Sequence, residues 1–303
     1  MKLITYILRN NPYSKQYIGI LNDNKNVIDL VSEGKKLLNK DFPQSMLGLI
    51  EADDNTLQDA KKLEALNPNT IPLSSVKLLS PIPKYSKNIF CVGRNYKLHI
   101  LEGARARGVE PTYPLVPELF TKPTTAVIGH EDSILLDSRL TSQLDYEVEL
   151  AMVIGKKSIN LTEENALASV FGYTILNDVS ARDAQRAHGQ WFKGKGFDTY
   201  CPIGPCIVTS DEFGDPSGHR ISLKVNGEIR QDSNTSDMLF NCKQILVSLS
   251  AGLTLEPGDT VATGTPSGVA LGMTPQQWLL DGHVIDLTID GIGTLSNIVK
   301  KVS

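Results

Sequence analysis

The stretch Leu144-Asp-Tyr-Glu-Val-Glu-Leu-Ala-Met-Val-Ile154 decides how the rest of the chain is interpreted. Most of its residues favour a β-strand, and side chains on a strand alternate between two faces. Glu147 and Glu149 are two residues apart, so they point the same way. Two glutamates placed like this repel each other unless water or a cation lies between them.

A third carboxylate, Asp178, ends the apolar stretch Phe171-Gly-Tyr-Thr-Ile-Leu-Asn177. Carboxylates are hard oxygen ligands, and three of them in largely apolar surroundings suit a divalent cation such as Mg²⁺. An isolated Glu-x-Glu pair is more often the solvated face of a strand, because charged residues are usually exposed. The segments that follow in the chain favour the metal site.

The composition is that of an ordinary globular protein. Of 303 residues, 41% are hydrophobic and 21% charged, and 30 basic against 34 acidic residues give a formal net charge of −4. No basic run or stripe offers a surface for nucleic acid, and no apolar run is long enough to span a membrane. The four cysteines show neither metal-ligand nor disulfide spacing, so we expect reduced thiols and a cytoplasmic location.

The prolines of Ser80-Pro-Ile-Pro-Lys84 disfavour regular structure and suggest a boundary. We therefore expect residues 1–80 to form a small N-terminal α/β domain and residues 81–303 the main domain. Within the first part, the apolar spacing predicts strands at 3–8, 17–21 and 27–31, and helices around 37–38, 46–50 and 57–66.

The main domain is rich in short extended segments separated by glycine and proline turns. Long βαβ alternation is missing, so we expect an α+β, mainly β fold with a rolled sheet instead of a doubly wound one. Asn226-Gly227 predicts a tight hairpin, and helices are expected after Thr162, as its cap, and over residues 240–250. The expected strands cover residues 88–92, 115–122, 126–128, 146–154, 172–176, 203–208, 221–225, 260–263, 283–289 and 293–299.

His99 and Glu102 follow in the segment Val92-Gly-Arg-Asn-Tyr-Lys-Leu-His-Ile-Leu-Glu102. On a helix that begins near Tyr96 they are three residues apart and can touch. A histidine oriented by a carboxylate is suited to act as a general base that activates water. Taken alone, such a pair is more often an ordinary surface pair.

Two polar residues follow Asp178 at helical spacing. On a helix that starts near Asp178, Arg182 and Gln185 lie on the same side as that aspartate. The planar guanidinium of Arg182 suits a substrate carboxylate, and Gln185 adds a hydrogen-bond donor. An exposed helical turn explains these residues equally well.

Two glycine-containing segments complete the set. Lys195 stands between glycines in Trp191-Phe-Lys-Gly-Lys-Gly-Phe-Asp198, which permit an unusual backbone and close approach of a ligand. The segment Thr263-Gly-Thr-Pro-Ser-Gly268 predicts a tight turn that presents the hydroxyl of Thr265 and backbone N–H groups. It lacks the lysine of a phosphate-binding loop. Solvated loop charges and a plain turn are the alternative interpretations.

In this order the segments resemble the fumarylacetoacetate hydrolase superfamily, through Gly-Arg-Asn-Tyr-x-x-His-x-x-Glu, Asp-Tyr-Glu-Val-Glu-Leu, Asn-Asp-Val-Ser-Ala-Arg-Asp-x-Gln, Gly-Lys-Gly-Phe-Asp and Thr-Gly-Thr-Pro-Ser-Gly. The resemblance covers about residues 82–299. It implies a rolled β fold, a small N-terminal domain and usually a homodimer. It also implies Mg²⁺ or Mn²⁺ at Glu147, Glu149 and Asp178, a catalytic lysine at Lys195, a His–Glu dyad at His99 and Glu102, and substrate contacts at Arg94, Arg182, Gln185 and Thr265.

The chain departs from the family in one place. Fumarylacetoacetase itself has an additional acidic ligand shortly before its histidine, where this chain reads Cys91-Val-Gly-Arg94. We therefore do not expect the tyrosine-degrading enzyme itself. Water is expected to complete the coordination shell, as Mg²⁺ commonly allows.

These residues together predict a metal-dependent hydrolase that cleaves a C–C bond in a small oxo-acid, such as an acylpyruvate or a fumarylacetoacetate-like diketo acid. The cation acts as a Lewis acid, Lys195 stabilises an enolate, and His99 activates water. Oxaloacetate decarboxylation, hydroxymuconate isomerisation and dienoate hydration at the same site stay open, as does a metal-stabilised oxo-acid-binding protein without activity. Residues 98–114 are expected to form a mobile cover over the substrate.

Overall fold

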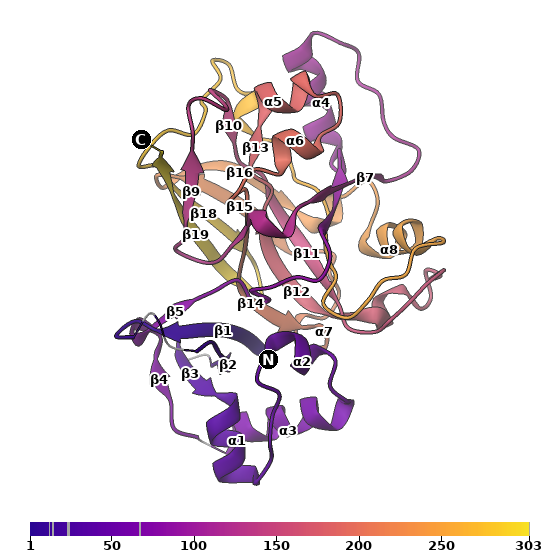
Figure 1. The fold of residues 1–303 in the computed structure, drawn as a ribbon. Coiled ribbons are helices and arrows are strands. Elements are labelled where there is room, and N and C mark those ends of the chain that lie inside the picture. Colours follow the sequence, from indigo (N-terminus) through magenta and orange to yellow (C-terminus); the bar gives the residue numbers. More distant parts are fainter. Residues whose placement is uncertain (12, 14, 23–24, 67, 303) are drawn as a thin grey trace.

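The structure is a computed structural model that describes residues 1–11, 13, 15–22, 25–66 and 68–302. The fold is α+β and mainly β, as the sequence predicts. Figure 1 shows two sheets in the upper part of the molecule and the first 80 residues beneath them. Among the described residues, no helix is long and apolar enough to cross a membrane.

The larger sheet runs through both parts of the chain. Strands β11, β12 and β14 at its centre are buried along their whole length, which explains their nearly continuous apolar sequences. Strand β5 (Val76–Leu78) pairs with β1, and β8 (Val127–Ile128) pairs with β14. In spatial order the path is β4 (Ile71–Pro72), β3 (Asn26–Asp29), β2 (Tyr17–Leu21), β1 (Lys2–Leu8), β14 (Cys201–Thr209), β12 (Val170–Asn177), β11 (Val148–Ile154), β17 (Thr260–Ala262), β6 (Ile89–Gly93) and β7 (Glu118–Lys122).

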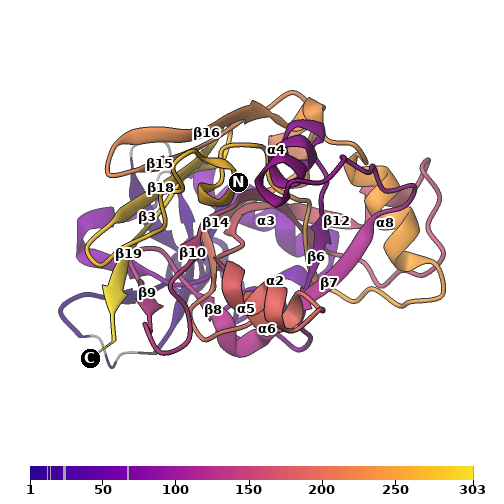
Figure 2. The ribbon, with the colours of Figure 1, turned by 90° about the horizontal axis from the view of Figure 1, so that it is seen from above.

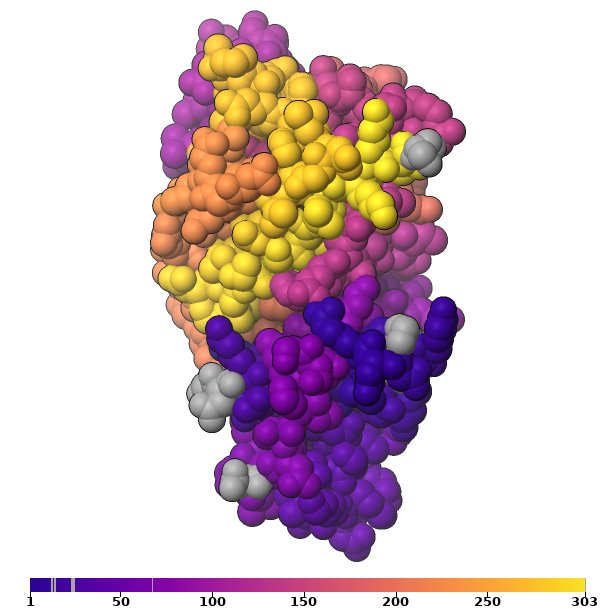
Figure 3. Space-filling view, turned by 90° about the vertical axis from the view of Figure 1, so that its left-hand side faces the viewer, coloured from indigo at the N-terminus to yellow at the C-terminus, as the bar shows by residue number. Residues whose placement is uncertain are grey.

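A second sheet packs against the first and forms one face of the molecule. Figure 3 shows its later strands in orange and yellow above the indigo N-terminal part. Asn226 and Gly227, at φ 51° and 82°, make the predicted hairpin between β15 and β16, because a tight hairpin turn needs positive φ at both positions. The order is β16 (Glu228–Asn234), β15 (Arg220–Val225), β18 (Val284–Ile289), β19 (Gly293–Lys301) and β9 (Ser133–Leu136), and β10 (Leu144–Asp145) pairs separately with β13 (Ser180–Ala181).

The first 80 residues add three capped helices to strands β1 to β5. Asp29, Ser45 and Asp53 each accept a hydrogen bond from a backbone N–H of the first turn. Their apolar faces form a core that also includes Phe171 and Ile207 of the larger part. Since β1 pairs with β14, one sheet joins the two parts, and the division at residue 80 stays a prediction. The helices are α1 (Leu30–Leu38), α2 (Met46–Ile50) and α3 (Asp54–Ala65).

The remaining helices are short. Figure 1 shows α4, α5 and α6 in the upper part of the molecule, and Figure 2 shows α5 and α6 side by side with α4 apart from them. They are α4 (Lys97–Arg107), α5 (Arg182–Ala187), α6 (Phe192–Lys195), α7 (Ser210–Phe213) and α8 (Cys242–Ser250). Single 3₁₀ turns cover Leu73–Ser75, Thr124–Ala126, Ala166–Ser169, Thr235–Asp237 and Ala270–Gly272.

Two predicted elements differ from the structure, one in where it ends and one in its type. The strand expected over 27–31 ends at Asp29, because the Asp29 carboxylate caps α1 by accepting from the N–H of Ser32 at 2.7 Å. The helix expected after Thr162 is only a 3₁₀ turn, and Thr162 donates its N–H to the side chain of Asn165 instead of capping a helix.

All four cysteines are buried and unpaired, as expected for reduced thiols. Burial raises the pKa of the Cys201, Cys206 and Cys242 thiols to about 12. Burial also raises the pKa of the Cys91 thiol well above its usual value. These thiols therefore stay protonated and unreactive at neutral pH.

Candidate active site

The three predicted metal ligands converge at one point of the larger sheet. Glu147 immediately precedes β11, Glu149 lies within it, and Asp178 follows β12. Because these strands are antiparallel neighbours, the start of β11 lies beside the end of β12, and the N–H of Asp178 donates to the carbonyl of Glu147 at 2.9 Å. All three carboxylates are buried, and each offers an oxygen within 4.8 Å of the others.

The helix expected to begin at Asp178 begins four residues later. Residues 180–181 pair with β10 as a short strand, and α5 starts only at Arg182. Asp, Val and Ser are weak helix formers, and pairing with β10 satisfies the backbone of this segment instead. Asp178 therefore reaches the site from the end of a strand.

Two buried ammonium groups bind the same carboxylates. Lys195 Nζ donates to Glu147 Oε2 at 2.6 Å and to Asp178 Oδ2 at 2.5 Å. Lys122, which sequence reasoning missed, donates to Asp178 Oδ1 at 2.5 Å and to the carbonyl of Val179 at 3.1 Å. Both side chains are almost completely buried.

The charges affect the two glutamates in opposite directions. Burial favours the protonated form of Glu147, but Lys195 and Arg182 lower its pKa below the ordinary value. Burial, Asp178 and Glu147 together raise the pKa of Glu149 well above its usual value. A divalent cation would supply a positively charged partner for Glu149 and so stabilise its ionised form. The donor set therefore fits Mg²⁺ or Mn²⁺.

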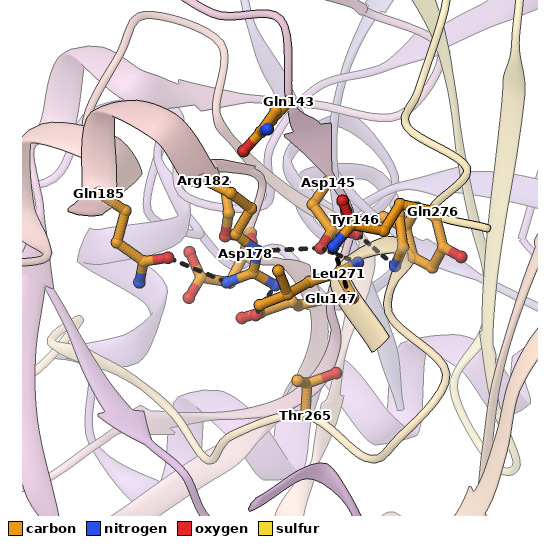
Figure 4. Close-up of polar contacts among 12 residues, drawn as sticks. Gln143, Asp145, Tyr146, Glu147, Asp178, Arg182, Gln185, Thr265, Leu271 and Gln276 are labelled. Atoms are coloured by element: carbon orange, nitrogen blue, oxygen red, sulfur yellow. Dashed lines mark hydrogen bonds and ion pairs between the residues drawn. The ribbon is translucent and has the colours of Figure 1, made fainter. Parts of the chain in front are cut away.

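Arg182 is held within the site by its own network. Its Nε donates to Asp145 Oδ2 at 2.9 Å, its Nη2 to Glu147 Oε1 at 2.5 Å and its Nη1 to Gln185 Oε1 at 3.2 Å (Figure 4). The guanidinium is thus already occupied by protein acceptors, and it orients Glu147. Its contact with a substrate carboxylate, and that of Gln185, stay predictions.

Asp145 is a site residue that the sequence did not reveal. Its carboxylate also accepts from the backbone N–H groups of Ala270 at 2.8 Å and Leu271 at 3.1 Å, and the side chain is fully buried. Asp145 therefore connects α5, β10 and the turn over 270–272. Its partners are far away in sequence, so no local pattern marks it.

We expect Asp145→Ala to lower the free energy of unfolding by about 3–5 kcal/mol, because it removes one of the two carboxylates that compensate the buried Arg182 charge. Denaturant titration measures this loss. The matched control is Asp232→Ala, which breaks the exposed Arg220–Asp232 pair of similar length, 2.8 Å, and should change stability little. Equal losses in the two variants would contradict the role given to Asp145.

The predicted dyad forms on α4. His99 Nδ1 lies 2.8 Å from Glu102 Oε1, and Glu102 Oε2 accepts from the N–H of Gly268 at 2.9 Å. An ionised carboxylate only accepts, so the proton of the neutral imidazole lies on Nδ1 and Nε2 keeps its lone pair. His99 is thereby suited to take up a proton through Nε2.

The segment 263–268 acts through its backbone more than through its hydroxyl. The N–H of Gly264 donates to Glu149 Oε2 at 2.8 Å, and that of Gly268 to Glu102. Both glycines have left-handed φ, 95° and 107°, which other residues rarely adopt. The hydroxyl of Thr265 donates to the carbonyl of Val148 at 2.9 Å and accepts from Gln231 at 2.8 Å. Its predicted contact with substrate is untested.

The glycines beside Lys195 serve packing. Lys195 lies in helix α6, and a Cβ on Gly194 would meet the backbone of Gln185 at 2.5 Å. Gly194 thus allows α6 to approach α5. Neither Gly194 nor Gly196 has left-handed φ, so the expected unusual backbone is absent.

A cavity of about 350 Å³ joins these groups. Glu102 lies behind His99, and the other nine predicted residues line the cavity: Arg94, His99, Glu147, Glu149, Asp178, Arg182, Gln185, Lys195 and Thr265. Phe120 and Trp191, in edge-to-face contact at 5.4 Å, form an apolar wall. Arg94 Nε donates to Glu118 at 2.6 Å, and its contact with substrate also stays a prediction.

Part of the expected cover is an ordered helix. Residues 97–107 form α4, whose inner face is buried. The segment 108–117 has no regular structure and, in Figure 1, arches away from the body of the molecule before entering β7. Closure over a substrate stays a prediction.

The chain is similar to known proteins over most of its length. Residues 88–300 match the family described as fumarylacetoacetate hydrolase, C-terminal. An oxaloacetate tautomerase of Bacillus subtilis is 44% identical over 294 residues, which is 94% of this chain and 96% of that protein.

Two of the similar solved structures align with this chain over the full length of both proteins. A fumarylacetoacetate hydrolase of Exiguobacterium antarcticum is 38% identical with a TM-score of 0.80. A maleylpyruvate hydrolase of Sphingobium, solved with manganese(II) and pyruvate, is 29% identical with a TM-score of 0.77.

Proposed function

The chain belongs to the fumarylacetoacetate hydrolase family, and from that premise we propose that it is a metal-dependent oxaloacetate tautomerase. The supporting observation is that a buried acidic triad, Lys195 and an oriented His99 meet in one cavity. Sequence reasoning placed C–C hydrolysis first and oxaloacetate second. The name of the Bacillus relative reverses that order and adds tautomerisation, which sequence reasoning had not considered.

Keto–enol conversion of oxaloacetate breaks one C–H bond at C3 and forms one O–H bond at the oxo oxygen. His99 Nε2 takes the C3 proton, and Glu102 stabilises the resulting imidazolium through Nδ1. The ammonium group of Lys195, held by Glu147 and Asp178, can offset negative charge on the oxo oxygen and donate the proton to it. Proton exchange with solvent then removes the proton from His99 and returns one to Lys195. The reverse sequence returns the keto acid, and no water is consumed.

A divalent cation would be held by Glu147, Glu149 and Asp178 and would supply Lewis-acid polarisation of the oxo group. Phe120 and Trp191 reduce the access of water to one side of the cavity. A drier cavity strengthens every charge interaction inside it. Mg²⁺ and Mn²⁺ both suit the donor set, and a homodimer and a cytoplasmic location stay predictions from the sequence.

Hydrolysis of a C–C bond is the second candidate, and the relation to maleylpyruvate hydrolase supports it. Hydrolysis would also use His99 as the base, but His99 would then take a proton from a water molecule that attacks the distal carbonyl. A metal-stabilised binding protein without activity remains the non-enzymatic alternative.

The test follows the ultraviolet absorbance of enol-oxaloacetate as it relaxes to the keto form. With Mg²⁺, the protein should accelerate this relaxation above the buffer rate, and a chelator should abolish the acceleration. Decarboxylation, maleylpyruvate and acylpyruvates are assayed in parallel. Faster turnover of an acylpyruvate than of oxaloacetate would favour the hydrolase, and tight binding of oxalate without any turnover would favour the binding protein.

A further inference from the structure

Arg107 is a cation of the cavity that no carboxylate compensates. Of the other arginines and lysines that line the cavity, Arg94 pairs with Glu118, Arg182 and Lys195 both pair with Glu147, and Arg186 donates to the side-chain oxygen of Gln143 at 2.6 Å. Arg107 lines the same cavity, yet among the described residues no acidic side chain forms an ion pair with it.

The backbone directs the Arg107 side chain toward the dyad. Arg107 lies eight residues after His99 on α4, and Gly103 lies midway, so the three share one face of the helix. Long helical side chains lean back toward the N-terminus. A Cβ on Gly103 would lie 3.4 Å from Arg107 Nη1, so the guanidinium extends over the bare glycine. It thus lies roughly one turn, about 5.4 Å, from His99 along the helix.

The surroundings of this guanidinium disfavour its own charge. Burial lowers the pKa of Arg107 from its usual value, and the positive charges of Arg94 and Arg182 lower it further. Arg107 is exposed where it lines the cavity, whereas the three carboxylates are buried, so we call the part of the cavity beside Arg107 its mouth. An anion that reaches the mouth would find a forked donor without a competing protein acceptor.

We propose that Arg107 binds the second carboxylate of a dicarboxylic 2-oxo acid and so selects diacids over monoacids. The inference rests on the proposed function and deepens it by naming the residue that sets the substrate class. The oxo acid end of the substrate lies at the acidic triad and Lys195, and its far carboxylate lies at α4. The substrate thereby spans the cavity past His99.

The test compares oxaloacetate with its 4-methyl ester, which differs only in the charge of the far end. Arg107→Met should lower kcat/KM for oxaloacetate by about 10- to 100-fold, mainly through KM, because a charge-assisted hydrogen bond is lost. The ester should be affected less than about twofold. Arg107→Lys should recover part of the loss.

The control is Arg105→Ala, which removes the same charge from the same helix. Arg105 does not line the cavity and donates only to the carbonyl of Gly272 at 3.5 Å, so this variant should keep the wild-type ratio of the two substrates. Oxalate, which is too short to reach the mouth, should bind the Mg²⁺-loaded wild type and Arg107→Met equally in calorimetry.

The outcomes separate the two claims. If the Mg²⁺-loaded wild type fails to tautomerise oxaloacetate, the proposed function and the role of Arg107 both fall. If the wild type is active but Arg107→Met loses both substrates equally, or neither, only the role of Arg107 is wrong.

Discussion

Replacing Glu149 by glutamine is expected to abolish the binding of Mg²⁺ and, with it, turnover. Glu149 supplies one of three buried carboxylates whose oxygens lie within 4.8 Å of one another. Loss of an outer partner of a metal site typically costs about 10- to 100-fold in affinity, and loss of a ligand should exceed this. Titration calorimetry with Mg²⁺ and Mn²⁺ measures the effect directly.

The same variant should unfold at no lower a temperature than wild type when both are free of metal. The folded protein raises the pKa of Glu149, so the associated stability is present at low pH and is lost as pH rises through that raised pKa. A glutamine does not ionise, so the variant avoids this loss of stability at neutral pH. Adding Mg²⁺ should raise the Tm of wild type and leave Glu149→Gln unchanged. A variant that still gains Tm with Mg²⁺ would disprove the assignment of Glu149 as a ligand.

His99→Ala is expected to lower kcat by roughly 10²- to 10⁴-fold, the usual contribution of a general base. The imidazole contacts Glu102 and lines the cavity, but none of the metal ligands depends on it for a hydrogen bond. The heat of Mg²⁺ binding should therefore stay as in wild type. Initial rates with oxaloacetate, together with calorimetry, separate these two effects.

His188→Ala is the matched control, because His188 is exposed on the neighbouring helix end and does not line the cavity. It should retain wild-type rates. Unimpaired turnover by His99→Ala would remove the proposed base, whereas a simultaneous loss of metal binding would indicate that His99 supports the site structurally.

The sequence predicted the parts of the site that follow short, regular spacing. Glu147 and Glu149 lie on one face because a strand alternates, and His99 meets Glu102 because a helix repeats every 3.6 residues. The long apolar segments around 148–154 and 170–177 were recognised as strands for the same reason, although their ends shifted by one to two residues.

The parts that the sequence did not predict depend on contacts between distant residues. Lys122 reads as a charge at the end of a strand, and only the fold brings it to Asp178, 56 positions away. Asp145 looks like an ordinary polar neighbour of Tyr146 until Ala270 and Leu271 are placed against it. Pairing with β10 likewise places residues 180–181 in a strand, where the spacing of Asp178, Arg182 and Gln185 had suggested a helix.

Strand β1 should protect the chain against aggregation while it is being synthesised. It pairs with the last part of β14, at Ile207 and Val208, on the edge away from β12. Without the N-terminal part, the N–H and C=O groups along that edge would be open to strands of other chains, which is how sheets begin to aggregate. Because the N-terminal part leaves the ribosome first, it is already available as a protective border when β14 emerges.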